Sequence, residues 1–155
     1  MDDSEVFAAL HPALRRFAAV VRPPDVEADD LIQEALARAL RQGRLDDLED
    51  PLVYLRRVIF NIAASHRRSS IRHRALRQKA IGRLNAVDDA YPSDLSELMR
   101  VPTDQRAVMY LHIVEGMPHD EIGLALGISA EASRARLSRG LRRLRIDIQE
   151  QEVRS

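Results

Sequence analysis

The sequence contains no cysteine and no tryptophan, and only 4% of its 155 residues are aromatic. The absence of cysteine excludes disulfides, thiolate nucleophiles and cysteine-based zinc sites. No apolar run approaches the roughly 18 residues of a membrane-spanning helix. The acidic start, Met1 to Glu5, also lacks the basic character of a signal peptide. We therefore expect a protein of the cytoplasm without a membrane span.

Lysine is almost absent as well, because Lys79 is the one basic residue that is not arginine. The 24 basic and 24 acidic residues balance, but they are segregated along the chain. Residues 61–85 hold seven basic and no acidic residues, and residues 122–145 hold six basic and one acidic. Two basic segments between acidic ones predict two surfaces that face polyanions, on a protein that also meets a partner through acidic faces. The alternative is a set of solvated helix faces.

Apolar residues recur every three or four positions through most of the chain, which predicts an all-α fold. The helices expected in the first part span residues 4–22, 25–42 and 51–84, the first capped by Ser4 and the last broken at Ser69 and Ser70. Residues 85–97 are polar and contain Pro92, as is typical of a flexible linker. The predicted organisation is two small helical domains, residues 1–84 and 98–155.

Residues 118–129 predict the first half of a helix-turn-helix, with a turn at Gly127 and a helix cap at Ser129. The helix that follows is rich in arginine, and its leucines 137, 141 and 144 are expected to face inward. In such motifs the second helix enters the major groove of DNA. The same layout also joins packed helices that touch no nucleic acid, but the arginines favour DNA. The residues predicted to contact it are Glu131, Arg134, Arg136, Ser138, Arg139 and Arg143.

A polar stripe follows the third predicted helix, where Tyr54, Arg57, Asn61, Ser65 and Arg68 recur every three or four residues. An aromatic ring stacks on a base, an amide reads a base edge and arginine binds phosphate, so the stripe suits a single-stranded or partly melted strand. Taken alone, it is also typical of a solvated helix face. The residues predicted to contact the strand are Tyr54, Arg57, Asn61, Arg67 and Arg68.

The sequence offers little for catalysis or for a metal. The five histidines are scattered, and no carboxylate completes the pairs that lie seven residues apart, His66 with His73 and His112 with His119. Adjacent carboxylates such as Asp29 and Asp30 point apart on a helix. We therefore predict no enzyme activity, no catalytic residue, no metal site and no cofactor.

In the order of these motifs along the sequence, the chain resembles the bacterial RNA polymerase sigma factors of the extracytoplasmic-function group. These proteins consist of two helical domains, region 2 and region 4. Residues 28–35 resemble the segment that docks on the clamp helices of core polymerase, and residues 51–63 the helix that engages the minus-ten promoter element. Residues 101–116 resemble the segment that leads into the helix-turn-helix, and residues 129–145 the reader of the minus-thirty-five element.

This resemblance implies a protein that binds core RNA polymerase, recognises both elements of promoter DNA and helps to open it, with an anti-sigma factor as a further partner. Two alternatives remain open at this point: a helix-turn-helix regulator that does not bind polymerase, and a sigma-like mimic that sequesters an anti-sigma factor. The polymerase contacts that the resemblance implies are Asp29, Asp30, Leu31, Gln33 and Glu34.

The chain departs from the family pattern at Tyr54, Phe60 and Ser133, and an acidic residue common near Ser65 is absent. The family usually has tryptophan at the place of Tyr54 and a basic residue at that of Phe60, which implies weaker or differently specific strand capture. At the place of Ser133 the family normally buries valine. Because serine lacks that packing and leaves a hydroxyl to satisfy, we predict a looser or shifted recognition helix, and a gain in stability from Ser133→Val.

Overall fold

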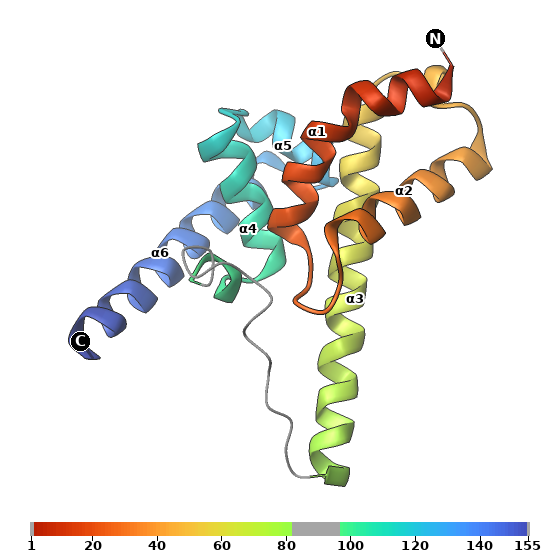
Figure 1. The fold of residues 1–155 in the computed structure, drawn as a ribbon. Coiled ribbons are helices and arrows are strands. Elements are labelled where there is room, and N and C mark those ends of the chain that lie inside the picture. The colour runs from red at the N-terminus through yellow and green to blue at the C-terminus, as the bar shows by residue number, and fades with distance from the viewer. Residues whose placement is uncertain (1, 82–96, 155) are drawn as a thin grey trace.

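The computed structural model describes residues 2–81 and 97–154, with side chains for 2–66 and 97–146, and every regular element in these ranges is a helix (Figure 1). The all-α prediction is therefore confirmed. The predicted linker, 85–97, lies outside the described residues except at Glu97. The helices are α1 (Asp3–Val21), α2 (Ala28–Gln42), α3 (Pro51–Ile81), α4 (Thr103–Met109), α5 (His119–Leu126) and α6 (Ala130–Arg154).

Helix α1 is capped by Asp2, two residues before the predicted cap Ser4. The backbone amide of Glu5 donates to Oδ1 of Asp2 at 2.8 Å, and the amide of Asp2 donates to Oε2 of Glu5 at 3.1 Å. This reciprocal pair is a capping box. A carboxylate there also opposes the positive end of the helix dipole. The sequence prediction of Ser4 as the cap is wrong for that reason.

Helix α3 begins as predicted, with the amide of Val53 donating to Oδ1 of Asp50 at 3.1 Å and Pro51 in the first turn. It then continues without interruption to Ile81, so the predicted break at Ser69 and Ser70 is wrong. Serine lowers helix propensity only slightly, whereas a break requires proline, glycine or a competing contact.

The second part of the chain contains two short elements in addition to its α-helices. A 3-10 turn, η3 (Leu98–Arg100), precedes α4, and a π-helix, η4 (Tyr110–Val114), continues it. Arg106 of α4 is buried, and its guanidinium donates to the carbonyl of Met99 at 2.8 Å and to that of Val101 at 3.0 Å. The buried charge thereby ties the start of α4 to the preceding turn, where backbone carbonyls accept its hydrogen bonds.

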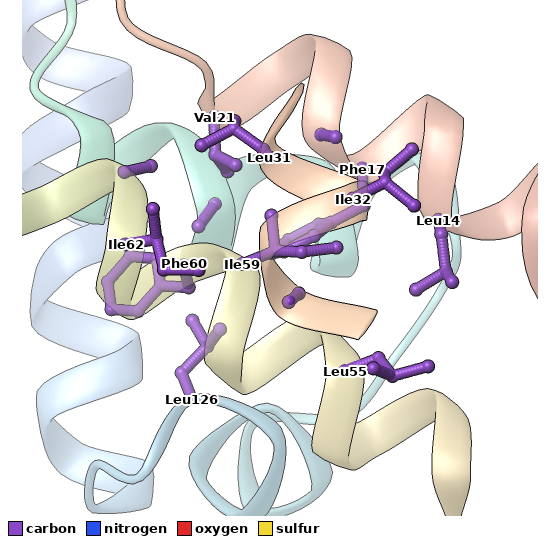
Figure 2. Close-up of a cluster of buried hydrophobic side chains, with 14 of the residues drawn as sticks. Leu14, Phe17, Val21, Leu31, Ile32, Leu55, Ile59, Phe60, Ile62 and Leu126 are labelled. Atoms are coloured by element: carbon purple, nitrogen blue, oxygen red, sulfur yellow. The ribbon is translucent and has the colours of Figure 1, made fainter. Parts of the chain in front are cut away.

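One hydrophobic core runs through both parts of the chain. In the first part the turn η1 (Leu45–Asp47) contributes the fully buried Leu45, although the sequence predicts a simple loop there. Figure 2 shows Leu126 of α5 beside Phe60 and Ile62 of α3, within the same buried cluster. Full burial of such a side chain stabilises the fold by about 1.5–3 kcal/mol. The two predicted helical domains are therefore packed together and not separate.

The arrangement of the helices follows from this core. Helices α1, α2 and α3 pack against one another, while α4 and α5 pack on α6 (Figure 1). Contacts of α4 with α1 and of α5 with α3 join the two groups. The second half of α3 and the C-terminal half of α6 extend away from this body in different directions (Figure 1).

Candidate nucleic-acid interface

The turn between α5 and α6 fixes the angle between these helices. Gly127 ends α5 in the left-handed conformation, with a φ of 73°. Gly123 lies so close to the next segment that a Cβ there would stand 2.5 Å from the carbonyl oxygen of Ile128. Oγ of Ser129 then accepts the amide of Ala132 at 3.0 Å and caps α6, as predicted. These contacts form the predicted helix-turn-helix.

The exposed face of α6 carries five of the six residues predicted to contact DNA. Because they recur at helical spacing, they share one side of the helix. Charged side chains predominate there, and a helix that presents them fits the major groove, which admits an α-helix and offers base-edge acceptors to arginine. These five exposed residues are Glu131, Arg134, Ser138, Arg139 and Arg143.

Arg136 does not belong to this face. Only 22% of its side chain is exposed, and its Nε lies 3.6 Å from Oδ2 of Asp104 on α4. Arg136 falls between the outward stripe and the buried stripe of α6, so α4 covers most of its side chain. Its contact with DNA stays a prediction, which this ion pair competes with.

The buried face of α6 differs from the predicted leucine stripe. Leu141 is 37% exposed, whereas Gly140 is buried against α4, where a Cβ would stand 2.6 Å from Sδ of Met109. Glycine permits this close approach of the two helices. Ser133 is fully buried, as predicted, on the same face as Leu137. Close packing at Gly140 turns α6 so that Leu141 moves to its flank.

The hydroxyl of Ser133 has a partner, which the sequence did not predict. Its Oγ lies 2.8 Å from Nδ1 of His119, in the first turn of α5. The ring of His119 stacks on that of His112, with centroids 4.3 Å apart and planes inclined by 15°. Burial, together with His112 and Arg134, lowers the pKa of His119. The seven-residue spacing of the two histidines was the only sequence signal for this cluster.

The polar stripe on α3 is formed as predicted over its described part. Arg57, Asn61 and Ser65 are exposed, and Tyr54 is half-buried with its hydroxyl 3.2 Å from Oε1 of Gln42. The predicted contacts Arg67 and Arg68 lie on the continuous helix, but their side chains lie outside the described residues. The described residues thus bring a ring, an amide and a guanidinium to one helix face.

An open pocket of about 470 Å³ adjoins this stripe. Tyr54 and Arg57 form one side, and carboxylates from the loop before α3 form the other. The sequence analysis missed the loop residues, although their place directly before the stripe was a usable signal. A ring, a guanidinium and acceptor oxygens suit a flat, polar ligand such as an unstacked base. The full lining is Leu48, Glu49, Asp50, Val53, Tyr54 and Arg57.

The acidic face of α2 is partly neutralised by neighbouring arginines. Oδ1 of Asp29 lies 2.9 Å from Nη1 of Arg15, and Oε1 of Glu34 lies 2.6 Å from Nη2 of Arg38. Asp30 and Gln33 are exposed as well, which leaves a polar surface available to a partner.

Leu31 requires a correction, because it is only 1% exposed and packs in the core. It therefore supports α2 from beneath and presents no surface to a partner. Leu31 and the equally buried Ile32 lie on the core side of α2, while Asp30 and Gln33 on either side of them are exposed.

Within residues 2–81 and 97–154, the structure contains no cluster of three or more histidine, aspartate or glutamate side chains arranged to hold a metal. In the same residues no helix is both long enough and apolar enough to span a membrane.

Comparison with known proteins assigns both halves of the chain. A family model described as Sigma-70 region 2 matches residues 6–73, and one described as Sigma-70, region 4 matches residues 95–144. The RNA polymerase sigma-E factor of Streptomyces coelicolor is 36% identical over 147 residues, which cover 88% of this chain and 80% of that protein. The chain belongs to the RNA polymerase sigma factors of the extracytoplasmic-function group.

One further relative supports this assignment, and one solved structure shows the same fold. The RNA polymerase sigma factor CarQ of Myxococcus xanthus is 31% identical over 153 residues, which cover 91% of this chain and 86% of that protein. A solved complex of the sigma factor RpoE with the anti-sigma factor NepR, from Bartonella quintana, has the same fold, with a TM-score of 0.66 at 22% identity. That match covers 94% of this chain and 96% of the solved chain.

In this sigma factor the two regions contact each other through side chains of helix α3. Nη2 of Arg56 lies 2.5 and 2.7 Å from the carboxylate oxygens of Glu115, and the guanidinium lies 5.7 Å from the ring centroid of Phe17. Arg57 donates to the carbonyl oxygen of Leu124 on α5. One of the predicted strand-binding side chains is therefore engaged by region 4.

The same contact accounts for Phe60, where the family usually has a basic residue. Phe60 is buried in the core shared by the two regions of this sigma factor, near Leu126 (Figure 2). A charged side chain at this place would be buried without a partner of opposite sign, which is unfavourable. The departure from the family pattern is thus matched to the packing of region 4 on region 2.

Proposed function

We propose that this alternative sigma factor reads the minus-thirty-five element with α6, holds the melted minus-ten strand along α3, and docks on core RNA polymerase through α2. The observation that carries the proposal is the exposed face of α6, where Arg134, Arg139 and Arg143 project from a helix that the turn at Gly127 holds in place. Arginine is suited to base edges and phosphate because its fork of donors matches both.

The minus-ten role rests on Tyr54, Arg57 and Asn61, together with the adjoining pocket. Stacking of an unpaired base on an aromatic ring is worth about 1–3 kcal/mol. We propose that the ring of Tyr54 and the pocket beside it receive a base from the melted strand. For this contact Arg57 has to release the carbonyl of Leu124.

The docking role rests on the exposed polar residues of α2, namely Asp29, Asp30, Gln33 and Glu34. Acidic side chains at such a surface favour a basic partner and speed its capture. The sigma factor then acts by recruitment and DNA opening without enzyme activity, metal or cofactor, in the cytoplasm where core polymerase works. The domain limits 1–84, 85–97 and 98–155 remain part of this proposal.

An anti-sigma factor is a further proposed partner, by analogy with NepR in the solved complex. The described residues that favour such a partner are apolar and exposed next to the contact between the two regions. Leu124 is 70% exposed, Val114 67% and Ile113 57%. Co-purification of the Leu124→Asp and wild-type chains from the native host tests this role, and equal sets of bound proteins would count against it.

Permanganate reactivity of unpaired thymines tests the proposed function directly. The wild-type chain with core polymerase should make thymines near the start site reactive on promoters found by sequencing of bound DNA. The double variant Tyr54→Ala/Asn61→Ala should lose this reactivity while still binding core, with circular dichroism as the control for folding. Tight core binding by the wild type with unreactive thymines would contradict the proposal and favour the sigma-like mimic.

A further inference from the structure

Among the described residues of α6, Ser133 is the one whose side chain is both polar and buried. Ser133 is 0% exposed, and its hydroxyl is 2.8 Å from Nδ1 of His119. Ser133 lies in the first turn of α6, directly before the exposed Arg134. The hydrogen bond therefore joins the first turn of α5 to the part of α6 that meets base edges in a helix-turn-helix.

His119 is held on its other side by His112. The two rings stack at 4.3 Å, and Nδ1 of His112 lies 3.0 Å from the carbonyl oxygen of Met117. Because a carbonyl oxygen only accepts, Nδ1 of His112 carries the proton and donates it. The orientation of His112 is thus fixed by the loop before α5, and the stacked ring of His119 is fixed with it.

We propose that His119 is a positioning residue for promoter recognition, which acts through Ser133 to set the rotation of α6 and hence the direction of Arg134. The inference rests on the proposed function of α6 as the reader of the minus-thirty-five element. The hydrogen bond with His119 fixes the orientation of Ser133, because a hydrogen bond constrains both distance and angle. The valine usual in the family would fill the same place without that constraint.

The geometry of helices explains why one buried contact matters for an exposed arginine. Residues 133 and 134 point about 100° apart on α6, so a rotation that moves Ser133 moves Arg134 with it. A recognition site needs its side chains placed within about 0.5 Å. Bidentate binding of arginine to a base is the contact most dependent on such placement.

Acid should weaken this positioning. Burial lowers the pKa of His119, and His112 on η4 and Arg134 on α6 lower it further. Asp120 and Glu121 follow His119 on its own helix. A protonated ring at this place is partly desolvated and is repelled by His112 and Arg134, so the charged form tends to leave Ser133. Because the pKa of His119 in the folded protein lies below 6.5, the positioning is complete at pH 6.5 and above and is lost as the pH falls through that lowered pKa.

The experiment uses the full chain with core polymerase. The probe is the duplex that this complex selects from a random pool, compared with the same duplex carrying a scrambled upstream element. The readout is the ratio of the two dissociation constants, measured at about pH 7.5 and about pH 5.5. Using a ratio removes effects of pH on polymerase that do not depend on the upstream sequence.

The variants separate positioning from general stability. His119→Ala should lower the ratio by about two- to tenfold, the equivalent of one hydrogen bond. His119→Asn places an amide donor near the Nδ1 position but does not titrate, so it should keep the ratio at both pH values. The control His11→Asn changes a histidine of α1. In this control and in the wild type, the ratio should be smaller at the lower pH than at the higher one.

Two further arms make the outcomes distinguishable. Arg134→Ala tests the proposed function of α6: an unchanged ratio in this variant would reject that function whatever happens at position 119. If Arg134→Ala lowers the ratio but His119→Ala does not, or if the wild type and His119→Asn respond equally to pH, the positioning role is overturned. Should either His119 variant fail to fold, Ser133→Ala removes the same hydrogen bond from the other side and takes its place, with the same expected loss.

Discussion

Arg56 of α3 and Glu115, at the end of the π-helix, form a bidentate ion pair between region 2 and region 4, with N···O distances of 2.5 and 2.7 Å. The Arg56 side chain is almost fully buried, and its Nε has no hydrogen-bond partner. Burial of the charge is thus compensated mainly by this carboxylate and by the ring of Phe17.

Removal of the carboxylate should therefore be costly. We expect Glu115→Ala to lower the free energy of unfolding by about 3–5 kcal/mol, because it leaves a buried guanidinium unpaired. Chemical denaturation of the full chain measures the loss. The matched control is Glu34→Ala, which breaks the exposed pair with Arg38 and should change stability by no more than about 0.5 kcal/mol. Equal losses in the two variants would show that the buried pair has no special role.

Asp30 should control the capture of core polymerase. It is exposed and, within the described part of the chain, makes no ion pair, whereas Asp29 is paired with Arg15. Asp30→Arg should slow association with core, most strongly at low salt, because charge complementarity acts mainly on the association rate. Stopped-flow association at two salt concentrations measures this effect. Asp120→Asn on α5 serves as the control, and an Asp30→Arg rate equal to that of this control would reject the docking surface.

The arginines of α6 should divide into two groups. Arg143→Ala should weaken binding to all sequences and lower the salt slope by about 1, as the loss of a phosphate contact does. Arg136→Ala should leave the salt slope unchanged and instead reduce stability, because Arg136 pairs with Asp104. Binding isotherms across a salt series decide the matter. A lower salt slope in Arg136→Ala would instead support the prediction that Arg136 contacts DNA.

Ser133→Val should destabilise the protein, the opposite of what the sequence predicts. The hydroxyl of Ser133 already has a partner, His119 at 2.8 Å, so valine would remove that hydrogen bond from a partly buried ring nitrogen. The loss of such a hydrogen bond costs about 0.5–1.5 kcal/mol. Thermal unfolding measures the change. The double variant His119→Leu/Ser133→Val should recover part of the loss, and a single variant more stable than the wild type would contradict the structural interpretation.

Stability should also decline in mild acid. Burial, His112 and Arg134 lower the pKa of His119 in the folded state, so between that pKa and the ordinary value of 6.5 the unfolded chain binds more protons. The contribution is fully present above pH 6.5 and falls as the pH decreases from there. Unfolding midpoints across this range should shift less in His119→Asn than in the wild type, and identical shifts would contradict the assignment.

Local signals in the sequence were sufficient for most helices and for the helix-turn-helix. Asp50 before Pro51, Gly127 and Ser129 specify helix ends through contacts within a few residues. The exposed face of α6 followed from its periodicity. At the first helix both Asp2 and Ser4 are suitable cap residues. Asp2 caps the helix because it forms a capping box with Glu5.

Contacts distant in sequence could not be predicted in this way. The pairs Arg56 with Glu115 and His119 with Ser133 join residues that no local pattern relates. The ion pair of Arg136 with Asp104 was not predictable either, because it depends on the close approach of α6 to α4 at Gly140. The likeness to the sigma family identified the two regions, but their packing depends on Phe60, where this chain departs from the family pattern.

The hydrogen bond from Arg57 to the carbonyl of Leu124 makes region 4 a competitor for a side chain that we propose to bind the melted strand. The affinity of the isolated chain for the single strand should equal the intrinsic affinity multiplied by the fraction of molecules in which Arg57 is released. Every 1.4 kcal/mol or so of contact energy between the two regions lowers that fraction about tenfold. A partner that binds only the separated regions therefore strengthens strand binding without touching the DNA.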